Sequence, residues 1–124
     1  SLGECCEIFS ALGYLLDRES ENLSGGEMQM VAISRALVGS PGLVLMDEPC
    51  QGLAPKIVQD VMRTVARMKA EGLGVLLVEQ NSRMALRISQ RAYALTTGSV
   101  ALSGNSADLL KDDRVKQLYL GGEL

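Results

Sequence analysis

The stretch LVLMDEP, at residues 43–49, decides the fold class of this chain. A wholly apolar run follows a Pro-Gly pair and stops at two carboxylates and a proline. Such a short apolar run predicts a strand that is covered on both faces, as the strands of a parallel sheet are. The carboxylates of Asp47 and Glu48 would then lie at the carboxyl edge of the sheet, where open α/β sheets bind their ligands.

Two adjacent carboxylates at that edge can serve phosphoryl chemistry. One acid can hold Mg²⁺, usually through water, and the next can orient or deprotonate an attacking water molecule. Taken alone, Asp-Glu-Pro is also a common surface turn, so the surrounding sequence has to decide between the two interpretations.

Helices alternate with strands on both sides of this stretch. One helix is predicted from its N-cap Ser24 to the breakers at 39–41, and another from Pro55 to Gly72. The remaining predicted elements are an amphipathic helix at 4–17, an apolar strand at 75–78, a short helix at 83–89, an antiparallel hairpin of 93–96 and 100–102 through 97–99, and a final pair of helical turns capped by Ser106. This alternation indicates an α/β fold with buried parallel strands, flanking helices and a C-terminal β-hairpin.

Composition narrows the function classes. The chain has 124 residues, enough for one compact domain, and its hydrophobic share of 47% supports a packed core. A net charge of −3 argues against a nucleic-acid partner, which normally meets a strongly basic face. The cysteines form no spaced framework, no histidine is present for a zinc site, and the apolar runs are too short to span a membrane. These features predict a cytoplasmic domain.

A glycine-rich corner opens the first of the long helices. Residues 23–27 read Leu-Ser-Gly-Gly-Glu, and Gln29 and Arg35 follow. Two glycines let backbone N–H groups approach an anion closely, the Ser24 hydroxyl adds a donor, and the helix dipole favours negative charge there. The corner is therefore either a phosphate site or an ordinary N-cap with glycines for a tight turn.

In this order, the corner and the acidic strand end resemble the signature and Walker B elements of the ABC ATPase family. The resemblance runs from Asn22 to the C-terminus and implies a partial ABC ATPase fold of the P-loop NTPase type. Residues 1–22 would be a remnant of the helical subdomain, and 23–124 the C-terminal half of the ATPase domain. The family builds each ATP site from two subunits and uses ATP and Mg²⁺. The resemblance assigns Ser24, Gly25, Gly26 and Glu27 to the nucleotide held by a partner subunit, Asp47 to Mg²⁺, and Glu48 to the role of general base or water-positioning acid.

Two departures point to one branch of that family. By the resemblance, Gly52, Leu53 and Ala54 form the D-loop, which crosses the dimer interface. Many family members carry an Asp in this loop and a His after the next strand to sense the γ-phosphate, and here those positions are Ala54 and Gln80. By the resemblance, Gln80 occupies the catalytic position where many members have the His. Its amide can still donate a hydrogen bond to a phosphate oxygen, although it carries no charge. Both variants, with the C-terminal tail, resemble the ATPases of branched-chain amino acid importers.

The phosphate-binding loop of the family needs a Gly-Lys pair, and no lysine of this chain follows a glycine. We therefore expect that the chain alone binds neither ATP nor Mg²⁺ and hydrolyses no ATP. It is either a piece of an importer ATPase that works with permease subunits at the inner face of the membrane, or a non-catalytic interaction module that docks on ABC ATPase partners or on itself. DNA-repair ABC ATPases share the signature. The net negative charge of this chain and the lack of a long coiled-coil arm with heptad repeats argue against that class.

If the chain is only half of an ATPase domain, one of its strands lacks a neighbour. In the fold that this chain resembles, the strand carrying the phosphate loop lies beside the strand at 75–78. Without it, that apolar strand has an unpaired row of N–H and C=O groups, which can pair with another chain. The gap could be closed by the chain's own strand at 93–96 or by a second copy. We expect self-association, and hence a homo-oligomer.

Overall fold

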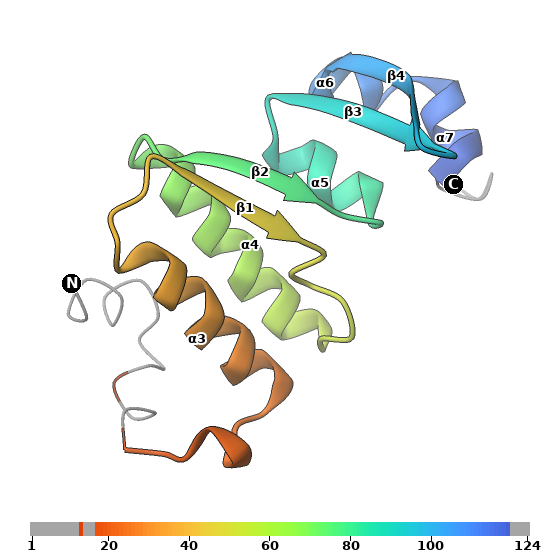
Figure 1. The fold of residues 1–124 in the computed structure, drawn as a ribbon. Helices are drawn as coiled ribbons and strands as arrows, with labels where there is room; N and C mark the ends of the chain where they lie inside the picture. Colours follow the sequence, from red (N-terminus) through yellow and green to blue (C-terminus); the bar gives the residue numbers. More distant parts are fainter. Residues whose placement is uncertain (1–12, 14–16, 120–124) are drawn as a thin grey trace. The chain divides into compact units, whose positions relative to one another are not determined.

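The computed structural model describes residues 13 and 17–119 and confirms the α/β fold class (Figure 1). The helix predicted at 4–17 lies almost entirely outside the described residues. The described chain divides into two compact units, the first ending at Leu77 and the second beginning at Val78. No helix in the described ranges is long and apolar enough to cross a membrane.

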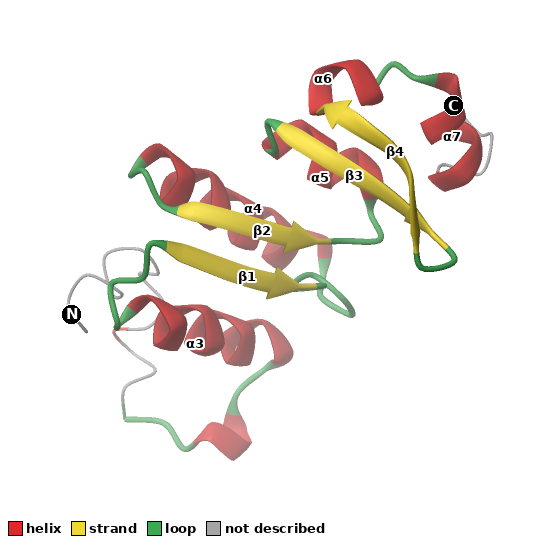
Figure 2. Cartoon of the chain, turned by 45° about the horizontal axis from the view of Figure 1, so that its top comes forward, coloured by secondary structure: helices red, strands yellow, loops and turns green. Residues whose placement is uncertain are grey.

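The first unit contains the two motifs of the sequence analysis. After a short 3-10 helix, η1 (Ser20–Asn22), it holds helix α3 (Gly25–Leu37), strand β1 (Leu43–Asp47), helix α4 (Pro55–Ala70) and strand β2 (Gly74–Val78). Strands β1 and β2 pair with each other and run in the same direction (Figure 2). The backbone N–H of Gly74, the first residue of β2, donates at 3.1 Å to the carbonyl of Gly42, which immediately precedes β1. The predicted parallel pair is therefore present.

Local signals set the ends of the two long helices. Ser24 is the N-cap of α3, as predicted. Pro55 is the first residue of α4. An N–H at this position would have no partner inside the helix, so proline loses no hydrogen bond there. At the other end of α4, Gly72 has φ +87°, the left-handed conformation that commonly ends a helix. The apolar residues Val61, Met62, Val65 and Met68 form a buried stripe along α4.

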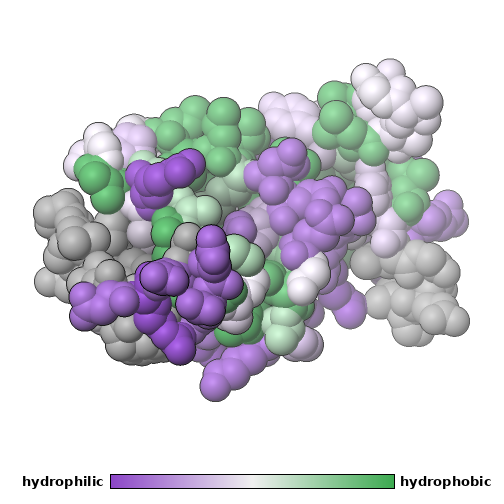
Figure 3. Space-filling view, turned by 60° about the horizontal axis from the view of Figure 1, so that its bottom comes forward, coloured by the Kyte–Doolittle hydropathy of each residue, from purple (hydrophilic) through white to green (hydrophobic). Residues whose placement is uncertain are grey.

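The prediction that β1 is covered on both faces is wrong for the described chain. Val44 and Met46 are buried with the apolar residues of α3 and α4, whereas Leu43 and Leu45 on the opposite face are exposed. In Figure 3, hydrophilic residues dominate the near side of the molecule and hydrophobic residues appear mainly along its upper border. A wholly apolar run is compatible with burial of both strand faces. Whether both faces are covered depends on other segments, which the run itself does not specify.

The second unit is a small α+β arrangement with its own core. It holds helix α5 (Ser82–Ile88), strands β3 (Arg91–Thr96) and β4 (Ser99–Asn105), and helices α6 (Ser106–Leu109) and α7 (Asp113–Tyr119). Its buried cluster consists of Leu86, Leu109 and Val115, with Ala92, Leu102, Leu110 and Tyr119 packed against it. The hydroxyl of Tyr119 also donates to the carbonyl of Leu95, which ties α7 to the hairpin.

Strands β3 and β4 form the predicted antiparallel hairpin, with Ala94 opposite Leu102 and Thr96 opposite Ser99. Thr97 and Gly98 both have positive φ, as a two-residue hairpin turn of the primed type requires. Ser99 belongs to β4 rather than to the turn. Among the described strands, β3 pairs with β4 and not with β2, so the chain does not close its own gap with this strand.

The cap predicted at Ser106 is also wrong. The N-cap of α6 is Asn105, and Ser106 is the first residue inside the helix. The Ser106 hydroxyl is buried and forms a hydrogen bond of 2.6 Å with the hydroxyl of Ser89. The side chain therefore joins α6 to the end of α5 instead of capping α6.

Candidate functional site

The corner at Ser24 is held by a reciprocal pair of hydrogen bonds. The backbone N–H of Glu27 donates to the Ser24 hydroxyl oxygen at 3.2 Å, and the backbone N–H of Ser24 donates to the Glu27 carboxylate at 2.8 Å. This capping box satisfies backbone donors that the first helical turn leaves without a partner inside the helix. It fixes the chain direction as it enters α3, which aims the N–H groups of Gly25 and Gly26 outward along the helix axis.

The hydrogen bonds of the cap favour the charged form of the Glu27 carboxyl and lower its pKa. The backbone N–H of Ser24, then its hydroxyl, hold the pKa of the Glu27 carboxyl below its usual range, while the slight burial of the group opposes them. Arg18 adds a weaker attraction, with its guanidinium 3.7 Å from the carboxylate. This partner could not be predicted from the motif, because Arg18 lies outside it. The carboxylate of Glu27 accepts a hydrogen bond within the cap, so the groups left to hold an anion at the corner are the N–H groups of Gly25 and Gly26 and the Ser24 hydroxyl.

The two glycines bring the corner against the segment that follows β1. A Cβ at Gly26 would lie 2.8 Å from Cγ2 of Ile57 in the first turn of α4, closer than real Cβ atoms come. A Cβ at Gly25 would lie 3.7 Å from Cδ2 of Leu53, an ordinary van der Waals distance. The structure thus places the corner beside residues 52–57. Sequence reasoning identified both segments, but it missed Ile57, the residue that explains why Gly26 has no side chain.

Gly25 and Gly26 offer a matched pair of substitutions. Alanine in a helix gains up to about 1 kcal/mol over glycine in intrinsic propensity. We expect Gly25→Ala to be neutral or slightly stabilising, because its methyl group has room. We expect Gly26→Ala to destabilise by about 1–2 kcal/mol, because Ile57 is β-branched and stiff and overpacking typically costs about 1–3 kcal/mol. Urea unfolding of both variants measures the difference.

A third variant tests the cause. In the double variant Gly26→Ala, Ile57→Ala, the methyl group of residue 26 has space, so most of the overpacking cost should disappear. The control is Ile57→Ala alone. If Gly26→Ala costs the same with and without the Ile57 side chain, the close contact between α3 and α4 is not what requires a glycine.

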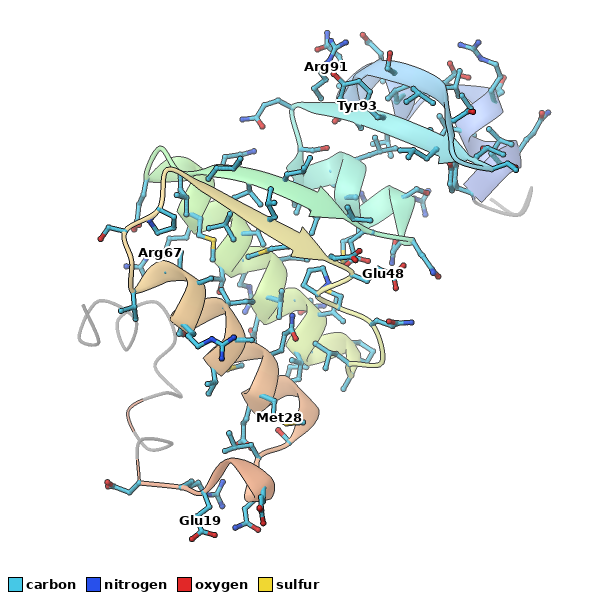
Figure 4. All side chains as sticks on the ribbon, viewed as in Figure 1. Glu19, Met28, Glu48, Arg67, Arg91 and Tyr93 are labelled. Atoms are coloured by element: carbon cyan, nitrogen blue, oxygen red, sulfur yellow. The ribbon has the colours of Figure 1, made fainter. Side chains whose placement is uncertain are left out.

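The acidic strand end lies in a tight turn. Asp47 is the last residue of β1 and is exposed, and Glu48 follows it, just beyond the strand in Figure 4. Glu48 has φ +46°, a conformation that non-glycine residues seldom adopt. Its carbonyl accepts a hydrogen bond of 3.1 Å from the N–H of Gln51, and the N–H of Leu53 donates to the carbonyl of Cys50 at 3.3 Å. The positive φ of Glu48 and these turn hydrogen bonds end β1 at Asp47.

The carboxylate of Asp47 can supply one ligand for Mg²⁺ but not a complete set. No group of three or more potential metal ligands of the His, Cys, Asp or Glu type gathers anywhere in the residues that are described. Magnesium, however, is usually held by one or two carboxylates together with substrate phosphates and water, not by a cage of protein ligands. The exposed carboxylate of Asp47 matches that requirement, and a phosphate group would have to supply the rest.

Gln80 and Cys50 belong to different units. Gln80 belongs to the second unit, where its carbonyl accepts a hydrogen bond of 2.8 Å from the N–H of Ser82 and its side chain is exposed. Next to it, the Asn81 side chain caps α5 by accepting from the N–H of Met84 at 3.1 Å. Cys50 is buried within the turn after β1, in keeping with a small packing residue.

Comparisons with known proteins agree on one family. The sequence model of the family described as ABC transporter matches residues 7–51. The high-affinity branched-chain amino acid transport ATP-binding protein BraG of Pseudomonas aeruginosa is 42% identical over 94% of this chain and 50% of its own length. The lipopolysaccharide export system ATP-binding protein LptB of Escherichia coli K12 is 39% identical over 87% of this chain and 45% of its own length.

Solved structures give the same result for the fold. The ADP conformation of an ATP-binding cassette of an ABC transporter superposes with a TM-score of 0.81 and 32% identity, over 95% of this chain and 48% of that one. A dimeric cassette in a post-hydrolysis state, bound to ADP and phosphate, superposes with a TM-score of 0.72 and 28% identity, over 83% and 44% of the two chains. This chain therefore spans about half the length of the relatives it matches.

Proposed function

This chain belongs to the ABC transporter ATP-binding proteins and spans about half their length, and we propose that it is their C-terminal half and supplies one half of a composite ATP site. The N–H groups of Gly25 and Gly26 and the Ser24 hydroxyl bind the γ-phosphate of ATP held by a partner cassette. Asp47 is the carboxylate ligand for Mg²⁺, which neutralises phosphate charge when it is bound. Glu48 orients the attacking water or accepts its proton, and Gln80 donates a hydrogen bond to a phosphate oxygen.

The observation that carries this proposal is the packing of the corner on residues 52–57. Gly26 fits against Ile57 and Gly25 lies beside Leu53, so the phosphate corner and the turn after the acidic strand end form one surface. A helix N-terminus with closely approachable N–H groups favours a phosphate group. A rigid corner keeps its donors in place, which is how a positioned anion site contributes to phosphoryl transfer.

A partner subunit is part of the proposal. The fold of this chain superposes on a cassette whose solved structure is dimeric. We infer that Gly52, Leu53 and Ala54 lie at the interface with a second cassette, either another ABC ATPase subunit or a second copy of this chain. In a transporter the assembly binds permease subunits at the cytoplasmic face of the membrane.

The transported substrate is proposed from the sequence. BraG and LptB are similar to this chain at 42% and 39% identity, and their names specify branched-chain amino acid transport and lipopolysaccharide export. We favour branched-chain amino acid import, because residues 52–55 and Gln80 have the form associated with that branch. The alternative is a non-catalytic module that docks on ABC ATPases.

A substitution at Ser24 tests the half-site. We expect this chain to slow the release of radiolabelled Mg-ATP from intact P. aeruginosa BraG about tenfold, within the usual range for coupling between sites. Ser24→Arg should abolish the effect, because the long side chain fills the corner where the phosphate would bind. The matched control is Ser103→Arg on the exposed hairpin, which should behave as the parent does.

The outcome separates the two functions. If Ser24→Arg slows nucleotide release as well as the parent chain, the corner does not contact the nucleotide. If neither polypeptide affects release but both bind the cassette, the chain acts as an interaction module.

A further inference from the structure

Arg18 reaches the corner at Ser24 from outside the motif. Its guanidinium lies 3.7 Å from one oxygen of the Glu27 carboxylate. The other oxygen of that carboxylate accepts the backbone N–H of Ser24 at 2.8 Å. Arg18 precedes Ser24 by six residues and belongs to neither η1 nor α3. A positive side chain from a separate segment therefore faces the acid that forms the cap.

The cap places a negative charge beside the proposed phosphate site. Ser24 takes part in both, since its N–H donates to the Glu27 carboxylate and its hydroxyl is one of the groups proposed to hold the phosphate. A phosphate bound there would lie well within the Debye length of about 8 Å from the carboxylate, so the two negative charges would repel each other. The corner has the backbone geometry for an anion, but its own acid opposes one.

Arg18 can offset this repulsion because a guanidinium is always positively charged. As an ion pair on the surface, with half of the Arg18 side chain in solvent, the contact with Glu27 contributes little to stability. The same guanidinium also acts on a bound phosphate group, which carries more than one negative charge. The charge of Arg18 therefore matters more for an anion at the corner than for the fold.

We propose, on the basis of the function above, that Arg18 is a further residue of the nucleotide half-site. It balances the charge of Glu27, so that the corner can hold the terminal phosphate of ATP bound by a partner cassette. Arg18 is thus a positioning residue that acts through the Glu27 carboxylate.

The experiment follows the release of radiolabelled Mg-ATP from intact P. aeruginosa BraG at low ionic strength, with this chain at saturating concentration. The parent chain should slow release about tenfold, as above. Arg18→Gln should slow it only about threefold, because the phosphate then faces an unbalanced carboxylate. Arg18→Lys keeps the charge and should remain within about twofold of the parent. At saturation, a variant that only binds BraG more weakly still reaches the release rate of the parent.

A substitution at Glu27 separates charge from structure. Glutamine can reach back to the N-cap as glutamate does, so Glu27→Gln keeps the cap and removes the negative charge. In the double variant Arg18→Gln, Glu27→Gln there is no charge left to balance, and the slowing should return to about tenfold. If Arg18 only held its own segment against α3, the double variant would be as weak as Arg18→Gln, because the ion pair is broken in both.

Ionic strength gives a second measurement that a structural role would not change. The difference between Arg18→Gln and the parent should shrink in about 1 M salt, where the Debye length falls to about 3 Å. The matched control is Arg67→Gln, which removes an equally exposed guanidinium paired with Glu71 at 3.1 Å. Arg67 lies ten residues after Ile57 in α4, about 15 Å along the helix axis, so this variant should behave as the parent does.

The other outcomes each contradict the role of Arg18. They are an Arg18→Gln chain that slows release as well as the parent, an Arg18→Lys chain as weak as Arg18→Gln, a double variant that is not restored, and a difference that high salt leaves unchanged. Far-UV circular dichroism checks that the variants fold, as exposed substitutions should.

The half-site and the role of Arg18 can be told apart. If the parent chain does not slow release, or if Ser24→Arg slows it equally well, the half-site is wrong and the role of Arg18 falls with it. If Ser24→Arg abolishes the effect and Arg18→Gln keeps it in full, the corner binds the phosphate without a charge-balancing residue.

Discussion

We expect the isolated 124-residue chain to release no phosphate from Mg-ATP above the rate of buffer alone. Catalysis of phosphoryl transfer is almost entirely positioning and charge stabilisation, and positioning alone can contribute about 7–11 kcal/mol of the barrier. No lysine in this chain follows a glycine, so we do not expect these residues to form the loop that cradles the β- and γ-phosphates. In the proposed site, Glu48 would activate water only when a phosphate group is held in front of it.

The control for this assay is the variant Glu48→Gln, which keeps the size of the side chain and removes its charge. Both polypeptides should give the same background rate in a steady-state phosphate-release assay. A turnover by the parent chain that disappears in Glu48→Gln would show that these residues form a complete ATPase site. A turnover that persists in the variant would identify a contaminating enzyme.

Much of the fold could be predicted because its signals are local. Ser24 and Glu27 are one helical turn apart, and their capping box depends on little else. Pro55 and Gly72 mark the ends of α4 through their own backbone preferences. The same holds for the hairpin, where Gly98 permits the positive φ that the turn needs.

The errors arose where distant segments decide the outcome. Residues 43–46 are all apolar, which is compatible with cover on both faces of β1, but Leu43 and Leu45 remain exposed in the described chain. At the start of α6, both Asn105 and Ser106 are suitable caps by residue type. Ser89 decides between them, because its hydroxyl bonds to the Ser106 hydroxyl and Asn105 is left at the N-cap position.

In the candidate site, too, the local features could be predicted and the features that depend on packing could not. The sequence indicated the corner at Ser24 and the acids after β1, because both are short motifs with a chemical reason for their residue types. It could not indicate that Gly26 packs on Ile57, since that contact depends on how α3 meets α4. Nor could it indicate the positive φ of Glu48, which follows from the turn that connects β1 to residues 52–55.

The last prediction concerns stability and uses two methionines of the same chain. Met68 lies on the buried stripe of α4 and is 2% exposed, whereas Met28, labelled on α3 in Figure 4, is 52% exposed. We expect Met68→Ala to lower the free energy of unfolding by about 2–5 kcal/mol, through lost burial and the cavity left behind. That is a large share of the roughly 5–15 kcal/mol that stabilises a typical domain.

Met28→Ala is the matched control, because it removes the same atoms from a surface position. Its effect should stay within about 0.5 kcal/mol, as for most surface substitutions. Urea unfolding followed by far-UV circular dichroism compares the two variants with the parent. Since both substitutions keep a good helix former, the difference between them measures burial alone. Equal losses of stability would mean that the burial of Met68 does not stabilise the core of the first unit.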